Sequence, residues 1–323
     1  MGHRLLLRAG AAAAITVALT GCAAFSDNSA GADDKLRVVA GLYPLQWVAQ
    51  EVAGDEVEVE NLTQPGQEPH DLELSPKETA DVASADLVVY EKGLQAAVDN
   101  AVDQTASGTP LDVSTVARLE PISHNGHDDV SHQGKGETAD EEAEESHESM
   151  GDLDPHFWQD PLRMADVADA VADKLSDIDP DHAATYKKNA ATVVAKLKAL
   201  DAAYTSGLAH CERDTIVVSH NAFGYLGRYG LYVEPIAGLS PDAEPTPADL
   251  VRLQKLITSD GVTTVFGERL VPQKLATTLA HDMHVTTAIL DPIEGLTSET
   301  SDDDYLSLMR ANLAALKKAN ACH

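Results

Sequence analysis

Basic residues are scarce in this chain of 323 residues. It carries 23 Lys and Arg against 53 Asp and Glu, which gives a formal net charge of −30 at pH 7. Proteins that bind nucleic acids place Lys and Arg against phosphates, so this charge argues against a nucleic-acid partner. The same charge favours solubility and attracts cations, but it does not by itself locate a cation site.

Long apolar runs and the usual zinc-hydrolase motif are also missing. The most apolar segment, 9–19, is shorter than the roughly 20 residues that a membrane-spanning helix needs, and no other segment is long and apolar enough. The sequence contains no His-Glu-x-x-His, and no second group of residues suggests an open metal position beside a general base. We therefore expect a protein that is not an enzyme, with a zinc hydrolase as the minor alternative.

The N-terminus is typical of an exported lipoprotein. A short basic start precedes the apolar stretch, which runs into Leu19-Thr20-Gly21-Cys22, a sequence that resembles a bacterial lipobox. We expect residues 1–21 to be a lipoprotein signal peptide and residues 22–35 to be a polar tether. Acyl chains on Cys22 would then hold the protein on the outer face of the cytoplasmic membrane. The alternative is an ordinary secretory signal with a chance cysteine.

Cysteine is rare, with three residues in all. Setting Cys22 aside leaves Cys211 and Cys322, which allow one intramolecular pairing in an exported chain. We predict a disulfide between them. The competing interpretation makes Cys322 and His323 additional metal ligands.

Apolar patterning predicts an α/β fold with parallel sheets. Strands are expected at 37–40, 56–61, 86–90, 111–113, 215–218, 231–236, 262–266 and 285–290. Helices are expected at 45–52, 76–83, 94–102, 161–175, 180–208, 222–229, 247–258, 272–283 and 303–319. Strands that alternate with helices across short links indicate sheets covered by helices on both faces. The long, Ala-rich stretch 180–208 reads as a stiff helix.

The mature length of about 300 residues suits two lobes. We expect an N-terminal α/β lobe at 36–160, a helical segment with the linking helix at 161–210 and a C-terminal α/β lobe at 211–323. Within the first lobe, residues 123–151 are rich in acidic and small residues and nearly free of apolar ones, and they carry His124, His127, His132 and His147. Such a composition predicts a disordered loop in the absence of metal.

Three further histidines mark a candidate metal site. His70, His156 and His220 each lie in an expected loop or at a strand end, next to turn-forming or rigid residues. Imidazole nitrogen is a preferred ligand of zinc and related ions, and a tetrahedral site needs one more group. In open parallel sheets, ligands bind beyond the carboxyl ends of the strands, where these residues are expected to lie.

Several carboxylates accompany the histidines. Asp291 and Glu294 follow the last expected strand and are candidates for the fourth ligand, with water as the other option. Glu268 and Glu68 are candidates either for direct ligands or for carboxylates that orient an imidazole, since metal-bound His usually donates its other N–H. Either could equally be a surface charge.

The same segments resemble the ligand motifs of metal-ion solute-binding proteins of ABC importers. The match runs in order through 66–76 (Gly-Gln-Glu-Pro-His-Asp-Leu-Glu-Leu-Ser-Pro), 154–161 (Asp-Pro-His-Phe-Trp-Gln-Asp-Pro), 219–226 (Ser-His-Asn-Ala-Phe-Gly-Tyr-Leu), 238–246 and 290–297 (Leu-Asp-Pro-Ile-Glu-Gly-Leu-Thr). The resemblance covers nearly the whole mature chain. It implies two doubly wound α/β lobes joined by a long rigid helix, with one metal ion in the cleft between them.

Within that family the chain resembles the zinc-type lipoproteins. They carry His at the third ligand position, where manganese-type members tend to have a carboxylate, and they often have a His-rich acidic insertion between the first two ligands. The resemblance also favours Glu294 over Asp291, because the Pro-Ile-Glu turn looks like that of similar Gram-positive-type chains.

The resemblance implies that the protein captures Zn²⁺ outside the membrane and delivers it, as a monomer, to an ABC permease and its ATPase. Two alternatives remain at this point: a surface adhesin that keeps zinc as a structural ion, and manganese or iron uptake by the same mechanism.

Overall fold

The first sheet of the fold is parallel, with the strand order β2-β1-β3-β4. In this computed structural model, which describes residues 35–106, 108–122 and 153–323, its strands are β1 (Leu36–Ala40), β2 (Val57–Asn61), β3 (Leu87–Tyr90) and β4 (Thr109–Asp112). The central strand β3, Leu-Val-Val-Tyr, is buried along its whole length. Apolar side chains on both faces of a strand require cover on both faces, and helices supply it.

Four helices accompany this sheet: α1 (Tyr43–Ala53), α2 (Pro76–Ser84), α3 (Ala96–Thr105) and α4 (Val113–Ala117). Helix α2 begins at a capping box, in which the Ser75 side chain accepts from the Glu78 N–H while the Glu78 carboxylate accepts from the Ser75 N–H. Helices α2 and α3 pack on one face of the sheet through Val82 and Val98, and α1 packs on the other. The loop between β2 and α2 carries His70.

The second sheet is also parallel, with the order β10-β9-β7-β8. Its strands are β7 (Thr215–Val218), β8 (Tyr232–Pro235), β9 (Thr264–Gly267) and β10 (Thr286–Ile289). Helices α7 (Pro247–Ser259) and α8 (Lys274–Met283) bury one of its faces through Leu253, Ile257 and Leu279. The chain closes with α9 (Tyr305–Asn320).

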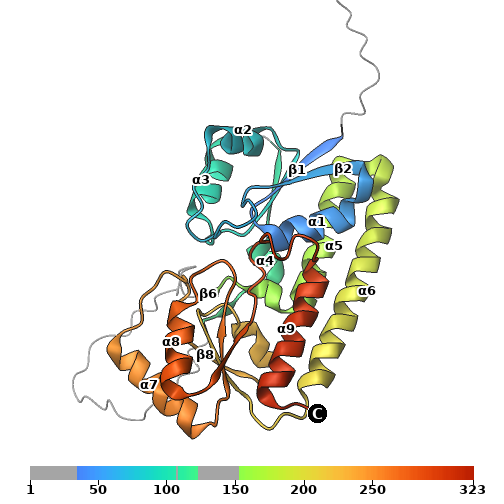
Figure 1. The fold of residues 1–323 in the computed structure, drawn as a ribbon. Helices are drawn as coiled ribbons and strands as arrows, with labels where there is room; N and C mark the ends of the chain where they lie inside the picture. The colour runs from blue at the N-terminus through green and yellow to red at the C-terminus, as the bar shows by residue number, and fades with distance from the viewer. Residues whose placement is uncertain (1–34, 107, 123–152) are drawn as a thin grey trace, which may run out of the picture. The chain divides into compact units, whose positions relative to one another are not determined.

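Helix α6 (Ala183–Leu208) is the longest helix in the described residues and packs against α5 (Pro161–Ile178), α1 and α9 (Figure 1). Its 26 residues correspond to a rod of about 39 Å. Asn189 donates to the Val52 carbonyl at 3.0 Å, which ties α6 to α1. Tyr204 donates to the Met309 carbonyl at 2.7 Å, which ties α6 to α9.

One apolar core reaches from the first sheet to the second. It includes Val38 and Leu87 of the first sheet, Ile216 and Phe266 of the second, and the inner faces of α1, α5, α6 and α9. The rings of Trp47 on α1 and Tyr305 on α9 stack at a centroid distance of 4.7 Å. Residues 35–323 therefore pack as one unit, and the division at 160 and 210 stays a prediction.

The α/β class, the parallel sheets flanked by helices and the long helix are confirmed. The helix predicted at 222–229 is present as the 3-10 helix Gly224–Tyr229, whose two glycines weaken an α-helix. The sequence also gave no sign of α4, or of the antiparallel pair β5 (Glu120–Pro121) and β6 (Leu153–Asp154). The signal peptide, Cys22, nearly all of the tether and the loop 123–151 lie outside the described residues.

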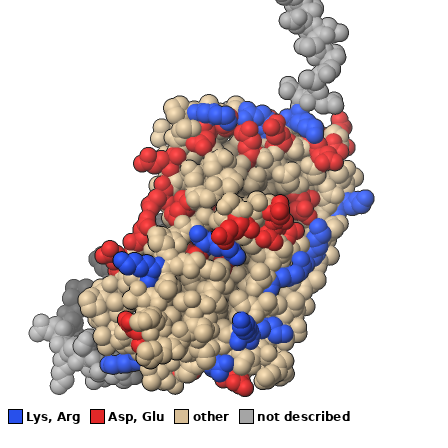
Figure 2. Space-filling view, viewed as in Figure 1, with Lys and Arg blue, Asp and Glu red and all other residues tan. Residues whose placement is uncertain are grey.

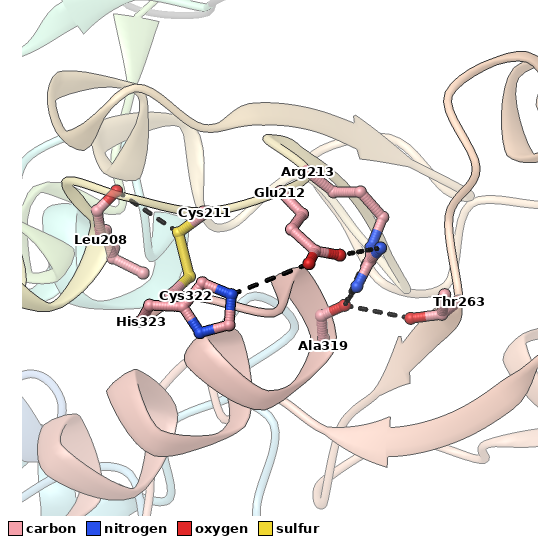
Figure 3. The surroundings of a disulfide bond; sticks show 8 residues. All are labelled: Leu208, Cys211, Glu212, Arg213, Thr263, Ala319, Cys322 and His323. Atoms are coloured by element: carbon pink, nitrogen blue, oxygen red, sulfur yellow. Dashed lines mark hydrogen bonds and ion pairs between the residues drawn. A yellow bond between two sulfur atoms is a disulfide. The ribbon is translucent and has the colours of Figure 1, made fainter.

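The predicted disulfide is present between Cys211 and Cys322 (Figure 3). It joins the segment before β7 to the end of α9, where the Ala319 carbonyl accepts from both Thr263 and Arg213. His323 lies 3.7 Å from the Glu212 carboxylate. The alternative in which Cys322 and His323 bind a metal was therefore wrong, because the Cys322 sulfur is already bonded.

Figure 2 shows several groups of Asp and Glu on one face, with Lys and Arg scattered among them. Among the helices of the described residues, none combines the length and the apolar composition that crossing a bilayer requires.

Candidate metal site

Four side chains from distant parts of the sequence meet at the carboxyl ends of the strands. They are His70, His156, His220 and Glu294, and one potential ligand atom from each lies within 4.8 Å of all the others. His70 lies in the loop after β2, His156 directly after β6, His220 after β7 and Glu294 after β10. Parallel strands deliver their following loops to one edge of a sheet, which explains the positions of the loops after β2, β7 and β10. His156 instead follows β6, which belongs to the antiparallel pair β5–β6.

Four of the six distances between the ligand atoms have the length expected for the edge of a tetrahedral site. The Glu294 Oε1 atom lies 3.3 Å from the Nε2 atoms of His70 and His156 and 3.4 Å from that of His220. The Nε2 atoms of His70 and His156 are 3.4 Å apart. A tetrahedral ion with bonds of about 2.0–2.1 Å separates its ligands by about 3.3 Å. The site therefore fits a small four-coordinate ion.

The cluster is almost closed to solvent. The side chains of His156 and His220 are fully buried, that of Glu294 is 1% exposed and that of His70 is 11% exposed. Without a cation, the rings compensate the buried carboxylate. Burial opposes ionisation of Glu294, but hydrogen bonds from His156, His220 and His70 hold its pKa well below the usual range.

The Nε2 atom of His220 is buried without a hydrogen-bond partner, 3.4 Å from Glu294 Oε1, whereas its other ring nitrogen is paired. Its Nδ1 atom lies 2.6 Å from Glu268 Oε1, and its backbone N–H donates to the same oxygen at 3.2 Å. Burial disfavours the charged ring, but the pairing with Glu268 and Glu294 raises the pKa of His220 to about 10. The Ser219 hydroxyl also donates to Glu268 Oε1. Glu268 thus lies where a carboxylate that orients an imidazole is expected.

The first two histidines share an acid–Pro–His pattern: Glu68-Pro69-His70 and Asp154-Pro155-His156. In both, the carboxylate accepts the backbone N–H of the His two residues later, at 3.0 Å. Asp154 Oδ1 also lies 2.8 Å from His156 Nδ1, whereas Glu68 Oε1 lies 4.0 Å from His70 Nε2. The turn fixes the backbone of each His before any ion arrives.

Glu294 is held in place by the His156 segment. The Pro292 carbonyl accepts from the Trp158 indole at 2.7 Å and from the Gln159 amide at 2.6 Å. Between Pro292 and Glu294, the buried Ile293 adopts a φ of 62°, which a β-branched residue rarely does. The segment that carries His156 and the segment that carries Glu294 are therefore joined by two hydrogen bonds.

Asp291, the other candidate for the fourth ligand, does not belong to this group. Its Oδ1 atom accepts the Ile293 N–H at 2.8 Å, and its Oδ2 atom lies 3.2 Å from Arg269 Nε. Burial raises the pKa of Asp291 to about 6, although the Ile293 N–H and Arg269 oppose the shift. Its carboxylate stabilises the loop that presents Glu294.

Sequence reasoning missed the role of Asp154, and the signal was available. The repeated acid–Pro–His pattern pointed to it as clearly as to Glu68. It also missed Gly224, where an added Cβ would come within 2.4 Å of Asp154 Oδ2, so that glycine leaves room for the carboxylate. Trp158 lies with its ring edge-on to His156, at a centroid distance of 5.4 Å.

The chain was compared with known proteins. A family model described as ZnuA, zinc-uptake complex component A periplasmic, matches residues 38–319. The zinc-binding lipoprotein AdcA of Streptococcus pneumoniae is 36% identical over 304 residues, which is 92% of this chain and 59% of that protein. This chain thus spans about 59% of the length of that relative.

A second relative by sequence and two solved structures are also similar to this chain. The high-affinity zinc uptake system protein ZnuA of Bacillus subtilis is 32% identical over 318 residues, which is 95% of this chain and 94% of that protein. The Zn(II)-bound structure of S. pneumoniae AdcA superposes with a TM-score of 0.71 at 32% identity, over 88% of this chain and 58% of that one. The laminin-binding protein Lmb of Streptococcus agalactiae, described as bifunctional with adhesin and metal-transporting activity, has a TM-score of 0.74 at 27% identity and is covered to 99%, against 88% of this chain.

Proposed function

Because this chain belongs to the family of zinc-uptake complex component A proteins, we propose that it captures Zn²⁺ outside the cytoplasmic membrane and delivers it to an ABC importer. The observation that carries the proposal is the nearly buried cluster of three imidazole nitrogens and one carboxylate oxygen, all within 4.8 Å of one another. His70, His156, His220 and Glu294 are the proposed ligands. Glu268 and Asp154 hold the rings, and Glu68 lies beside His70 as a further acceptor.

The donor set favours zinc over manganese. Three imidazoles and one carboxylate suit zinc, whereas manganese prefers carboxylate, carbonyl and water oxygens. Elemental analysis of the protein purified without added metal separates zinc from manganese and iron. Zinc as the predominant metal is the expected result.

Binding rather than catalysis is the proposed role. A catalytic zinc keeps a coordination position for water or substrate, whereas four protein ligands fill the tetrahedron here. The zinc-hydrolase alternative would require an exchangeable water on the bound ion, which spectroscopy of the Co²⁺-substituted protein would detect.

The proposed setting is the outer face of the cytoplasmic membrane, with Cys22 acylated and the folded part acting as a monomer. The proposed partners are an ABC permease and its ATPase. The histidines of the 123–151 segment, His124, His127, His132 and His147, are proposed to collect zinc weakly and raise its local concentration.

A second function is suggested by the likeness to the adhesin Lmb. In that alternative the protein binds a host ligand and keeps zinc as a structural ion. The two roles differ in whether the fold needs the ion, and that difference is measurable.

Replacing one ligand tests the site directly. In calorimetric titration with Zn²⁺, the His220→Ala variant should lose at least 100-fold in affinity, because outer partners of metal ligands alone account for about 10- to 100-fold. His281→Ala is the matched control, since its side chain is 86% exposed on α8. Equal affinity in the two variants would refute the proposed site.

A further inference from the structure

The four proposed ligands are nearly closed to solvent, so an ion needs a route to reach them. Three of them are at most 1% exposed, so an ion reaches the site past His70, the one that remains partly exposed. A cavity of about 120 Å³ adjoins His70. Water takes roughly 30 Å³ per molecule, so the cavity has room for an ion with part of its hydration shell.

The walls of this cavity are largely apolar, with one buried acid. Leu94, Leu119, Leu153, Pro155 and Leu239 line it, and the exposed Lys92 and Gly93 lie at its rim. Glu91, the residue directly after β3, also lines it and is 2% exposed. Like the proposed ligands, Glu91 follows the carboxyl end of a parallel strand.

Glu91 is unusual because no hydrogen bond offsets the cost of burying its carboxylate. Neither carboxylate oxygen has a hydrogen-bond partner among the described residues, and both are inaccessible to solvent. Burying a carboxylate without a partner is costly, so such a group is either protonated or meets a cation. The proposed binding function does not employ Glu91.

The surrounding charges favour a cation. Asp154, Asp112 and Asp99 all act on Glu91 electrostatically as like charges. Lys92 is the basic group at the rim, and because it is exposed its ammonium can stay in water. A divalent cation in the cavity would therefore lie in a negative potential.

Resting on the proposed zinc-binding function, we propose that Glu91 forms a transit site for the divalent cation. The ion enters the cavity from the rim, is held briefly by the Glu91 carboxylate, which turns its oxygens toward the cavity to meet it, and passes across His70 to the four-ligand site. It leaves by the same route. Glu91 acts on the rate of exchange and makes no contact with the ion in its final position.

Stopped-flow fluorescence tests this assignment. Trp158 packs against His156, so its emission reports filling of the four-ligand site. Zn²⁺ is mixed with the metal-free protein for the association rate, and the zinc-loaded protein is mixed with EDTA for the dissociation rate. The variant is Glu91→Gln, which keeps shape and removes charge, and the control is Glu73→Gln, the same change at an exposed position.

The expected result is that association and dissociation both slow about tenfold in Glu91→Gln, while the Kd stays within threefold of the control. Glu91→Asp, which keeps the charge, should restore most of both rates. Rates equal to those of Glu73→Gln would overturn the transit site and leave Glu91 as a protonated core acid. Faster dissociation with a weaker Kd would also overturn it. Absence of tight 1:1 zinc binding in the unaltered protein would instead refute the proposed function itself.

Discussion

At the scale of single residues, the site depends on carboxylates that do not touch the ion. Asp154 and Glu268 each accept a hydrogen bond from a ring nitrogen that faces away from the site, at 2.8 and 2.6 Å. These bonds fix the tautomer and the direction of the Nε2 lone pair. The hydrogen bonds to Asp154 and Glu268 therefore determine how the imidazole rings of His156 and His220 are oriented in the proposed site.

Asp154→Asn should weaken zinc binding about tenfold without unfolding the protein. The amide oxygen still accepts a hydrogen bond, but it lacks the charge that makes the imidazole a better donor to zinc. Asp173→Asn on α5 is the control, because Asp173 is exposed. Competition with a zinc chelator of known affinity measures both variants, and an affinity equal to the control would show that Asp154 only shapes the turn.

The histidines could be predicted from the sequence because each stands in a distinctive turn. The choice between Asp291 and Glu294 could not be made from the residues alone, since they are three positions apart in one loop. The positive φ of Ile293 and the pairing of Asp291 with Arg269 settle which carboxylate faces the rings. An isoleucine gives no local signal for that conformation. Glu91 was missed because a single acid after a strand resembles many surface acids.

At the scale of elements, the strands and most helices followed from alternating apolar runs. The apolar runs that form β3, β7 and β9 are continuous and fully buried, so the sequence indicates these strands clearly. The pair β5–β6 has two residues per strand and joins segments separated by 123–152, so no local pattern marks it. The helix predicted at 222–229 is a 3-10 helix, and apolar spacing does not distinguish 3-10 from α over six residues.

The turn between α5 and α6 gives an element-scale prediction about pH. Asp179 accepts from the Tyr186 hydroxyl at 2.6 Å and pairs with His182 Nδ1 at 2.7 Å. The bonds from Tyr186 and His182 lower the pKa of Asp179 below 3.8 against weak burial, and Asp179 in turn raises the pKa of His182 above 6.5. Both contributions to stability are complete at about pH 5–6. The Asp179 contribution is lost as pH falls through its lowered pKa, and the His182 contribution as pH rises through its raised pKa.

Asp179→Asn should therefore lower the free energy of unfolding by about 1–2 kcal/mol at pH 5.5, since hydrogen bonds to charged groups are worth roughly this much. The difference from the unaltered protein should shrink as pH falls through the lowered pKa of Asp179, because the carboxyl group is then neutral in both the folded and the unfolded state. Urea unfolding across this range checks the profile, with Asp181→Asn as the exposed neighbour control. A difference that persists unchanged in acid would contradict the assigned charge.

At the scale of the whole molecule, the sheets and helices are held together by contacts that do not involve the four proposed ligands. One core links both sheets, and α6 is tied to α1 and α9 by hydrogen bonds remote in sequence from the four ligands. The disulfide between Cys211 and Cys322 adds a covalent link at the end of α9. Zinc is thus expected to stabilise a structure that already exists.

Removing zinc with a chelator should lower the melting temperature by roughly 5–10 °C while leaving the far-ultraviolet circular dichroism at 25 °C unchanged. Free zinc at about 100 times the Kd contributes about 2.7 kcal/mol, and in a chain of this size each kcal/mol shifts the midpoint by a few degrees. His220→Ala should show no such shift. Complete unfolding on chelation would instead favour the adhesin alternative with its structural zinc.

In the described residues, one apolar core runs from the first sheet to the second, so moving the sheets apart would expose side chains that are now buried. Loading and release of the ion are then expected to need only local movement beside His70, where the cavity adjoins the proposed site. The Glu294 segment is less free to move, because the Pro292 carbonyl accepts hydrogen bonds from Trp158 and Gln159. The body of the protein would thus remain unchanged through repeated cycles of capture and delivery.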